Sequence, residues 1–299
     1  MIFRVLDIET VPDESCWTRG EPAYKLVPGP LQQVGGGSGL GSVVMMSAAG
    51  VAVVEPFPPP QACRVVALSC VDVVFDLNHD PKYRFGGCWS DCLWCPWDLA
   101  EADRQERIIL DKFGAGICDD VHLVTWNGRG FDLPVISMRS LKHRVSCGWY
   151  YKKQGGKEER RYRYSTEGHC DLMDYLSDYG ASRQMRLGDC ARLIGLPGKT
   201  DMSGDKVDVL YRQVAEQPEL SAEHAAKIRR YCQQDTLQTA LLFVRTRYHF
   251  GKLSPESHDA TMRTFRDSEA VREAIDVDWD KLMLSGRQAA SPGGADGNQ

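Results

Sequence analysis

Residues 2–10, IFRVLDIET, contain the pattern that decides the fold of this chain. The stretch is largely apolar up to residue 8, as in a strand that is buried inside a sheet. Successive side chains of a strand point to opposite faces, so Asp7 and Glu9 share one face with Val5. Two carboxylates on a core-facing side are costly to bury unless cations neutralise them. This strand therefore predicts both a buried sheet and a cation site at its end.

Residues 121–143, VHLVTWNGRGFDLPVISMRSLKH, contain a second predicted strand and a predicted helix. The strand VHLVTW is followed by a glycine-containing turn and then by a helical pattern, with Asp132 near the start of the helix. Strand ends are where open α/β sheets build their sites. Taken alone, Asp132 has an ordinary alternative, since Asp is a common residue at helix N-termini.

A long helix is predicted around the sequence RRYCQQDTLQTALLF. Residues at helical spacing form one largely apolar stripe along it: Ile228, Cys232, Asp235, Thr239 and Leu242. Asp235 lies inside this stripe, and Tyr231 lies one turn earlier on the same side. The alternative for this pair alone is two surface residues, so its meaning depends on the other segments.

In order and spacing, these segments resemble the three motifs of the DEDD 3′–5′ exonucleases. The first, D-x-E, is at Asp7 and Glu9. The second, N-x-x-x-F-D, ends at Asp132, and the third, Y-x-x-x-D, is at Tyr231 and Asp235. The tyrosine resembles that of the DEDDy branch. The chain is most similar to the predicted exonucleases related to the proofreading domain of family B DNA polymerases.

The resemblance, over roughly residues 1–250, implies roles for these residues. Asp7, Glu9 and Asp235 would hold the metal ion that activates water. Asp7 would bridge to a second ion, which Asp132 would ligate directly or through water. Tyr231 would orient the attacking water. Two Mg²⁺ or Mn²⁺ ions, roughly 4 Å apart, suit phosphodiester hydrolysis and carboxylate ligands.

The same resemblance extends to residues near the motifs. Asn127 and Phe131 would shape the site around the terminal nucleotide. Asp171 lies in an H-x-D-L segment and is expected to be a supporting residue, although capping of the helix it begins is the simpler role. Gly198 and Lys199 resemble a G-K turn of this exonuclease group, in which Lys199 would contact a substrate phosphate.

A basic and aromatic segment follows the second motif at 142–164, KHRVSCGWYYKKQGGKEERRYRY. Cations that meet phosphates and aromatic rings that stack on bases are the usual elements of single-strand binding. The candidate contacts are Lys152, Lys153, Arg160, Arg161 and Tyr162. The alternative is a solvated β-hairpin with a charged tip.

Composition indicates a reduced, globular protein. The 299 residues are 42% hydrophobic with a net charge of −5, and no run approaches the ~20 apolar residues of a membrane helix. No signal peptide is recognisable, so we expect a cytoplasmic location and no membrane partner. The eleven cysteines are scattered and odd in number, which favours reduced thiols. Cys88, Cys92 and Cys95 lack the fourth ligand of a structural zinc site, so core thiols are favoured over metal ligands.

The order of elements predicts a ribonuclease H-like α/β fold, a mixed sheet flanked by helices. Residues 64–75 and 83–90 should form a hairpin of long strands, and 98–113 a helix. We expect an exonuclease domain at 1–255, with a Gly- and Pro-rich flexible insertion at 27–60. A helical extension at 256–284 and a disordered tail at 285–299 should follow.

The sequence therefore predicts a two-metal 3′–5′ exonuclease that acts on single-stranded nucleic acid ends. The preference for DNA rests on the resemblance alone. The alternatives are an RNA 3′ exonuclease and an inactive, nuclease-like binding module.

Overall fold

The computed structural model describes residues 1–18, 23–26, 43–46, 51–55, 57–93, 95–153, 160–164, 166–198, 202 and 204–285, with the backbone alone at 23–26, 43–46, 51–55 and 205. Its main sheet has five strands in the order β6-β5-β1-β7-β8. These are β1 (Ile2–Pro12), β5 (Cys63–Phe75), β6 (Tyr83–Cys92), β7 (Val121–Thr125) and β8 (His169–Asp171). β5 runs antiparallel to both β1 and β6, whereas β7 runs parallel to both β1 and β8. This mixed sheet confirms the predicted ribonuclease H-like α/β fold and the predicted hairpin of long strands.

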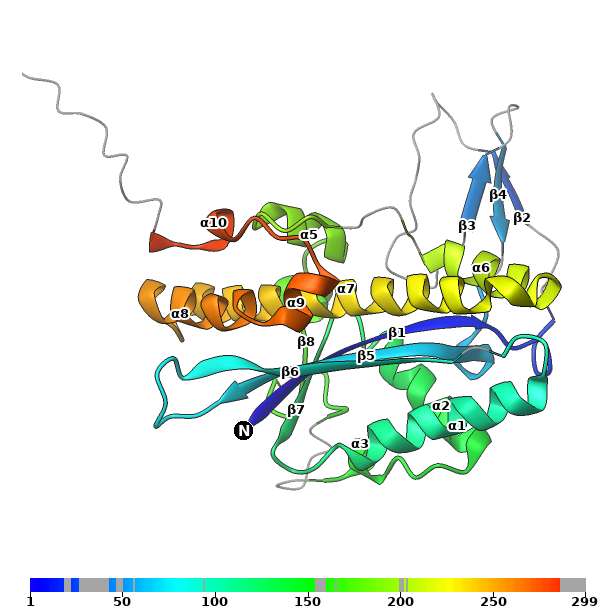
Figure 1. The fold of residues 1–299 in the computed structure, drawn as a ribbon, viewed down its shortest axis with the longest axis horizontal. Helices are drawn as coiled ribbons and strands as arrows, with labels where there is room; N and C mark the ends of the chain where they lie inside the picture. Colours follow the sequence, from blue (N-terminus) through cyan, green and yellow to red (C-terminus); the bar gives the residue numbers. More distant parts are fainter. Residues whose placement is uncertain are drawn as a thin grey trace, which may run out of the picture.

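Helices cover both faces of the sheet (Figure 1). α1 (Leu99–Ala115) and α2 (Asp132–His143) lie below it in that view, and α7 (Ser221–His249) lies above. The alternation within β1 matches this layering: Val5 belongs to the core beneath α7, while Leu6 and Ile8 belong to the core that α1 and α2 cover. Odd-numbered residues of β1 therefore face α7, which sets the direction of Asp7 and Glu9.

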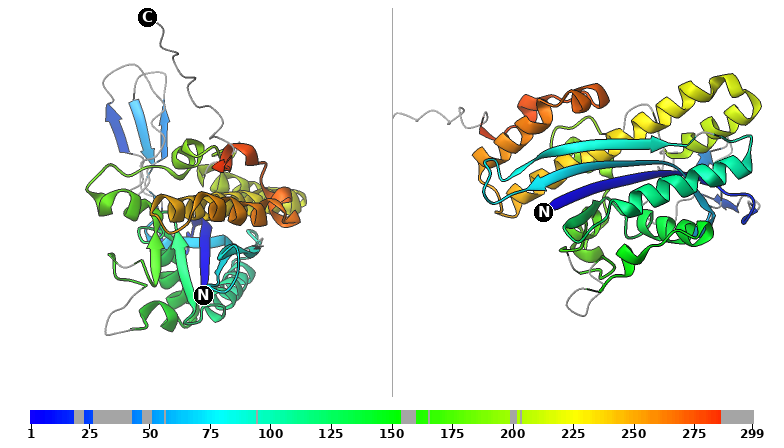
Figure 2. Two further views of the ribbon diagram at one scale, coloured as in Figure 1. Left: turned by 90° about the vertical axis from the view of Figure 1, so that its left-hand side faces the viewer. Right: turned by 60° about the horizontal axis from the view of Figure 1, so that its bottom comes forward.

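The remaining helices are shorter or lie at the C-terminal side. They are α3 (Gly148–Tyr151), α4 (Leu172–Leu176), α5 (Leu187–Leu193), α6 (Gly204–Glu216), α8 (Pro255–Arg266), α9 (Glu269–Ala274) and α10 (Trp279–Leu282), with short 3₁₀ turns η1 (Pro60–Ala62), η2 (Asp178–Gly180) and η3 (Pro218–Leu220). α8 and α9 lie alongside α7 in Figure 2. Met262, Phe265 and Val271 from these two helices share the core of Val5. The residues expected as a helical extension are thus packed onto the main sheet, while the expected tail from 286 onward lies outside the described residues.

A small second sheet interrupts the chain between β1 and β5. It contains β2 (Ala23–Leu26), β3 (Val43–Met46) and β4 (Val51–Glu55), all antiparallel, in the order β2-β4-β3. Two of these strands lie within the predicted insertion at 27–60, most of whose other residues are not described. Pro12 pairs directly with Cys63, so the chain leaves the main sheet and rejoins it at the same point. Within the described residues, no helix has the length and apolar character needed to cross a membrane.

Candidate active site

β1 presents the first two predicted metal ligands toward α7. Glu9 is buried and Asp7 is half-buried, although both are carboxylates. The pairing of β1 with β5 is irregular between Glu9 and Thr10. Such bulges bend a strand and redirect its side chains, and they are frequent next to active sites. The end of β1 therefore combines buried charge with a local change of strand geometry.

α7 crosses this end of β1 and brings the third motif to it. The thiol of Cys232 donates a hydrogen bond to the backbone oxygen of Asp7 at 3.4 Å. Its sulfur and one carboxylate oxygen each from Asp7 and Glu9 lie within 4.8 Å of one another, close enough to share one cation. Burial, followed by the charges of Asp7, Glu9 and Asp235, raises the pKa of Cys232 well above its usual range. The sequence placed Cys232 on the helix stripe but did not identify it as a neighbour of the metal ligands.

The pKa of Tyr231 reflects the negative charge of the site. Its pKa is strongly raised, first by burial and then by the charges of Glu9, Asp235 and Asp7, with a hydrogen bond to Asp235 adding to the effect. A phenol surrounded by three carboxylates stays protonated at neutral pH. The donor set is thus rich in oxygen and negative in sign, which fits hard divalent cations such as Mg²⁺ and Mn²⁺.

Asp132 joins the second motif to β1. It is the first residue of α2, and its Oδ1 accepts a hydrogen bond from the backbone N–H of Ile8 at 3.2 Å. Ile8 lies between the two acidic residues of the first motif, so all three motifs meet at one end of β1. Burial raises the pKa of Asp132 to about 7, and the nearby charge of Asp171 contributes to the rise. Asp132 is therefore a buried carboxyl that a cation would favour in its charged form.

The loop before Asp132 is held by β8 and the end of β7. Asp171 accepts hydrogen bonds from the backbone N–H groups of Asn127 and Arg129, both at 2.9 Å. The hydroxyl of Thr125 accepts from Gly128 N–H at 3.2 Å and is itself bonded to His169 at 2.7 Å. Three consecutive amides of the loop are thus fixed from the sheet. Asp171 also caps α4, so its expected capping role and its expected supporting role are both fulfilled.

Comparison with known proteins assigns the chain to a family. A family model described as a predicted 3′–5′ exonuclease related to the exonuclease domain of PolB matches residues 55–278. The chain belongs to this exonuclease family. Among solved structures, it is similar to a family B DNA polymerase from the hyperthermophilic archaeon Pyrobaculum calidifontis, with 14% identity and a TM-score of 0.39. The similarity covers 89% of this chain and 29% of the polymerase, so the chain spans less than a third of that protein. No curated protein matches the sequence.

The region matched by the exonuclease family contains Asp132, Tyr231 and Asp235 but begins after Asp7 and Glu9. The assignment of the first motif therefore depends on the geometry of the site. β1 lies between β5 and β7, and the charges of its two carboxylates act on Tyr231 of α7. The insertion between β1 and β5 lengthens the chain without removing β1 from the sheet.

Phe131 has an aromatic neighbour that the sequence did not reveal. Its ring lies 5.7 Å from that of Phe57, measured between centroids. Phe57 is 39% exposed and lies near the end of the insertion predicted at 27–60, whose composition gave no signal for this contact. An exposed ring against the second motif adds an apolar wall beside the predicted site for the terminal nucleotide.

The basic segment after α2 is only partly available to a substrate. Lys152 pairs with Asp119 at 2.6 Å, and both side chains are largely exposed. Arg160 is buried, and its guanidinium donates to the backbone oxygens of Trp149, Cys118 and Val121. It therefore supports the fold from inside and presents no surface to a phosphate, unlike the expectation from the sequence.

The other predicted contacts differ in their surroundings. Lys153, Arg161 and Tyr162 are exposed, and the Arg161 guanidinium lies 4.6 Å from the ring centre of Tyr151. The segment contains the short helix α3, and no hairpin joins its described parts. Lys199 lies outside the described residues.

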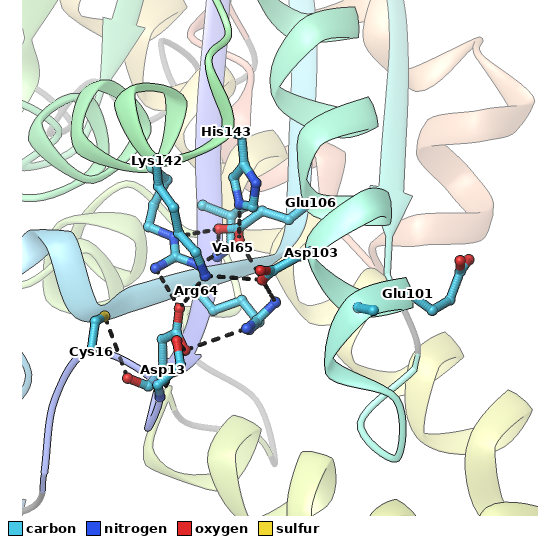
Figure 3. A network of polar contacts seen from close by, with 12 residues as sticks. Asp13, Cys16, Arg64, Val65, Glu101, Asp103, Glu106, Lys142 and His143 are labelled. Carbon is cyan, nitrogen blue, oxygen red and sulfur yellow. Dashed lines mark hydrogen bonds and ion pairs between the residues drawn. The ribbon is translucent and has the colours of Figure 1, made fainter.

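A second group of potential metal ligands, Asp103, Glu106 and His143, lies in a separate network (Figure 3). Arg64 and Lys142 both contact Asp103 there, at 2.5 and 3.0 Å. Cations of the protein already neutralise these carboxylates, so the group is structural. Among the described residues, neither group of potential ligands includes Cys88, Cys92 or Cys95; Cys95 is buried, whereas Cys88 and Cys92 are half-buried.

Arg139 is the centre of this network and is fully buried. Its guanidinium donates to Glu106 at 2.5 and 2.7 Å and to Asp13 at 2.7 Å. Burial alone would raise the pKa of Glu106, but hydrogen bonds from His143 and Arg139 outweigh it and lower the pKa. Arg139 lies on α2, and Asp13 follows β1, so the network ties together the two elements that carry Asp132 and Glu9.

Proposed function

We propose that this protein is a divalent-metal-dependent exonuclease that releases 5′-nucleoside monophosphates from the 3′ ends of single-stranded DNA. The observation that carries the proposal is the meeting of Asp7, Glu9, Tyr231 and Asp235 where α7 crosses β1, in a chain of the predicted exonuclease family. These groups come from two separate elements, and Asp132, from a third, accepts a hydrogen bond from the backbone of Ile8, which lies between Asp7 and Glu9.

The chain offers ligands for two Mg²⁺ or Mn²⁺ ions. Asp7, Glu9 and Asp235 would hold one ion, and Asp7 would share the second with Asp132, directly or through water. Such a pair supplies an activated hydroxide and charge compensation on the leaving oxygen. Oxygen ligands that are already buried and converging need little rearrangement to bind hard cations.

Tyr231 would orient the attacking water. The raised pKa keeps its hydroxyl protonated, so the group remains a hydrogen-bond donor at the pH of the reaction. The hydroxyl is bonded to Asp235, which fixes its direction beside the metal ligands. Asn127 and Phe131 would shape the pocket for the terminal nucleotide. Lys152, Lys153, Arg161, Tyr162 and Lys199 are the proposed contacts for the rest of the strand.

The reaction itself is the first prediction. Purified protein with 5′-labelled single-stranded DNA should shorten the strand one nucleotide at a time from the 3′ end, and only with Mg²⁺ or Mn²⁺. A matched RNA strand tests the alternative substrate in the same assay. Activity in excess EDTA, or cleavage of a circular single strand, would contradict the proposal.

Replacing Tyr231 by Phe tests its role in the reaction. The substitution keeps the ring that packs beside Val11 and Ile228 and removes only the hydroxyl. We expect turnover to slow by about 10–10⁴-fold, the range for loss of one positioned polar group. Single-turnover kinetics at saturating Mn²⁺ would measure this, and a wild-type rate would refute the assigned role.

A further inference from the structure

Five aromatic side chains form a continuous series of ring contacts beside the loop that precedes Asp132. Centroid distances are 5.9 Å for Tyr162–Tyr164, 4.9 Å for Tyr164–Tyr179, 6.0 Å for Tyr179–Tyr175 and 4.9 Å for Tyr175–Phe250. The rings come from the segment before β8, from α4, from η2 and from the end of α7. Tyr162 and Tyr164 are 45% and 61% exposed, so this series, the aromatic track, reaches the surface.

The turn that carries Tyr179 has an unusual backbone. Asp178, Tyr179 and Gly180 all have positive φ, at 49°, 56° and 94°. A left-handed conformation is costly for a tyrosine, and such residues cluster at functional sites. The Tyr179 carbonyl accepts a hydrogen bond from Arg163 at 3.0 Å, which holds the turn in place. The fold thus accepts local strain to insert this ring between Tyr164 and Tyr175.

Ion pairs connect the track to the loop of the second motif. Arg163 pairs with Asp174 at 3.0 Å, and Asp174 lies 3.6 Å from Arg129. Arg129 belongs to that loop and donates to the backbone oxygen of Arg161 at 3.2 Å, directly before Tyr162. One end of the track therefore lies next to the loop that positions Asp132.

Cations lie at both ends of the track. Arg161 precedes Tyr162, and the Arg247 guanidinium lies 5.4 Å from the ring centre of Phe250. Aromatic rings interleaved with cations match a single-stranded nucleic acid, whose bases stack and whose phosphates are negative.

We propose that the aromatic track binds the bases of the strand upstream of the nucleotide that is removed. This inference rests on the proposed exonuclease activity and adds a path for the substrate across β8 toward the C-terminal end of α7. Phe250 lies fifteen positions after Asp235, which is roughly 22 Å at the rise of an α-helix. That length accommodates at most about six stacked nucleotides.

Binding of 5′-labelled oligodeoxynucleotides of two to twelve nucleotides tests the track, with the full chain and with Ca²⁺ in place of Mg²⁺. The double variant Tyr162→Ala/Tyr164→Ala should bind the twelve-nucleotide strand about 5- to 150-fold more weakly, the effect of losing one stacked base. Because Tyr162 and Tyr164 lie at the end of the track next to the loop of the second motif, the loss of affinity should already appear with three nucleotides and should not grow beyond about six. Tyr162→Phe/Tyr164→Phe should restore affinity, and Trp97→Ala, at an equally exposed ring, should bind like wild type.

Abasic oligonucleotides test the same point without altering the protein. Removing the bases three to six positions from the 3′ end should weaken binding to wild type and should have less effect on the double alanine variant. No loss of affinity in the double alanine variant at any strand length, or a loss that keeps growing beyond about six nucleotides, would overturn the proposal of the track. If the wild type binds through the track but releases no nucleotide, the exonuclease proposal fails and the track stands. A wild type that binds no strand would refute both.

Discussion

Replacing Asp7 by Ala should abolish nucleotide release while the protein stays folded. Asp7 is the one residue proposed to contact both metal ions, and its charge acts on both Tyr231 and Cys232. We expect at least about a 10³-fold loss in rate, since one oxyanion-hole donor alone contributes 10²–10³-fold. Rates should be measured with labelled single-stranded DNA across a range of Mn²⁺ concentrations.

The stability of the same variant separates a catalytic role from a structural one. Removing one of several converging carboxylates relieves repulsion in the metal-free protein, so the melting temperature should stay the same or rise. Asp235→Ala should behave alike. Asp111→Ala, at an exposed position of α1, is the control and should keep full activity. Substantial activity in Asp7→Ala, or loss of activity only together with unfolding, would contradict the metal-ligand role.

Replacing Arg139 by Met should destabilise the protein by about 3–5 kcal/mol, the usual cost of breaking a buried ion pair. The substitution removes the guanidinium that bonds both Glu106 and Asp13, and leaves these buried carboxylates with the more distant Arg64 as the cation they share. Urea unfolding at neutral pH would measure the loss. Arg104→Met, at an exposed pair with Glu101, is the control and should leave the unfolding midpoint almost unchanged. A deficit below 1 kcal/mol for Arg139→Met would show that the network contributes little.

The stability lost in Arg139→Met should depend on pH, and the pKa values of the two carboxylates give the direction. The folded-state pKa values of Asp13 and Glu106 lie below their ordinary values. Their ion pairs therefore stabilise the fold above the unfolded pKa of about 4, and this stability is lost as the pH falls through the folded values. The deficit of Arg139→Met should shrink toward acid pH, where the stranded carboxylates become protonated. Adding Glu106→Gln should recover part of the stability at neutral pH.

The sheet and the clustering of the acidic residues could be predicted because their signals are local. β1 and α7 each carry a hydrophobic period of their own, interrupted by carboxylates at core-facing positions. Asp235 lies within an apolar stripe, where an acid is costly to bury, so the sequence marks it as a candidate site residue, and the structure shows that it is buried. The pairing of β1 with β5 and β7 then brings the segments together.

The residues that escaped prediction depend on partners far away in the sequence. Arg139 looks like a surface residue of α2 until Asp13 and Glu106 are placed against it. Arg160 looks like a phosphate ligand until the carbonyls of Trp149 and Val121 surround it. A local pattern shows that a residue is polar. Only the assembled fold shows whether its side chain binds groups inside the protein or faces solvent and substrate.

The pairing of Pro12 with Cys63 has a consequence for how this chain can change over time. Everything between these residues leaves and re-enters the sheet as the connection of a single hairpin. Lengthening such a connection is thermodynamically cheap, at about 0.6 kcal/mol for each doubling. The segment can therefore be shortened, extended or exchanged as a module, provided that Asp13 and Ala62 keep the backbone bond that closes its base at 2.7 Å. Related chains can differ widely in this segment and still bring Asp7 and Glu9 to the same place in the sheet.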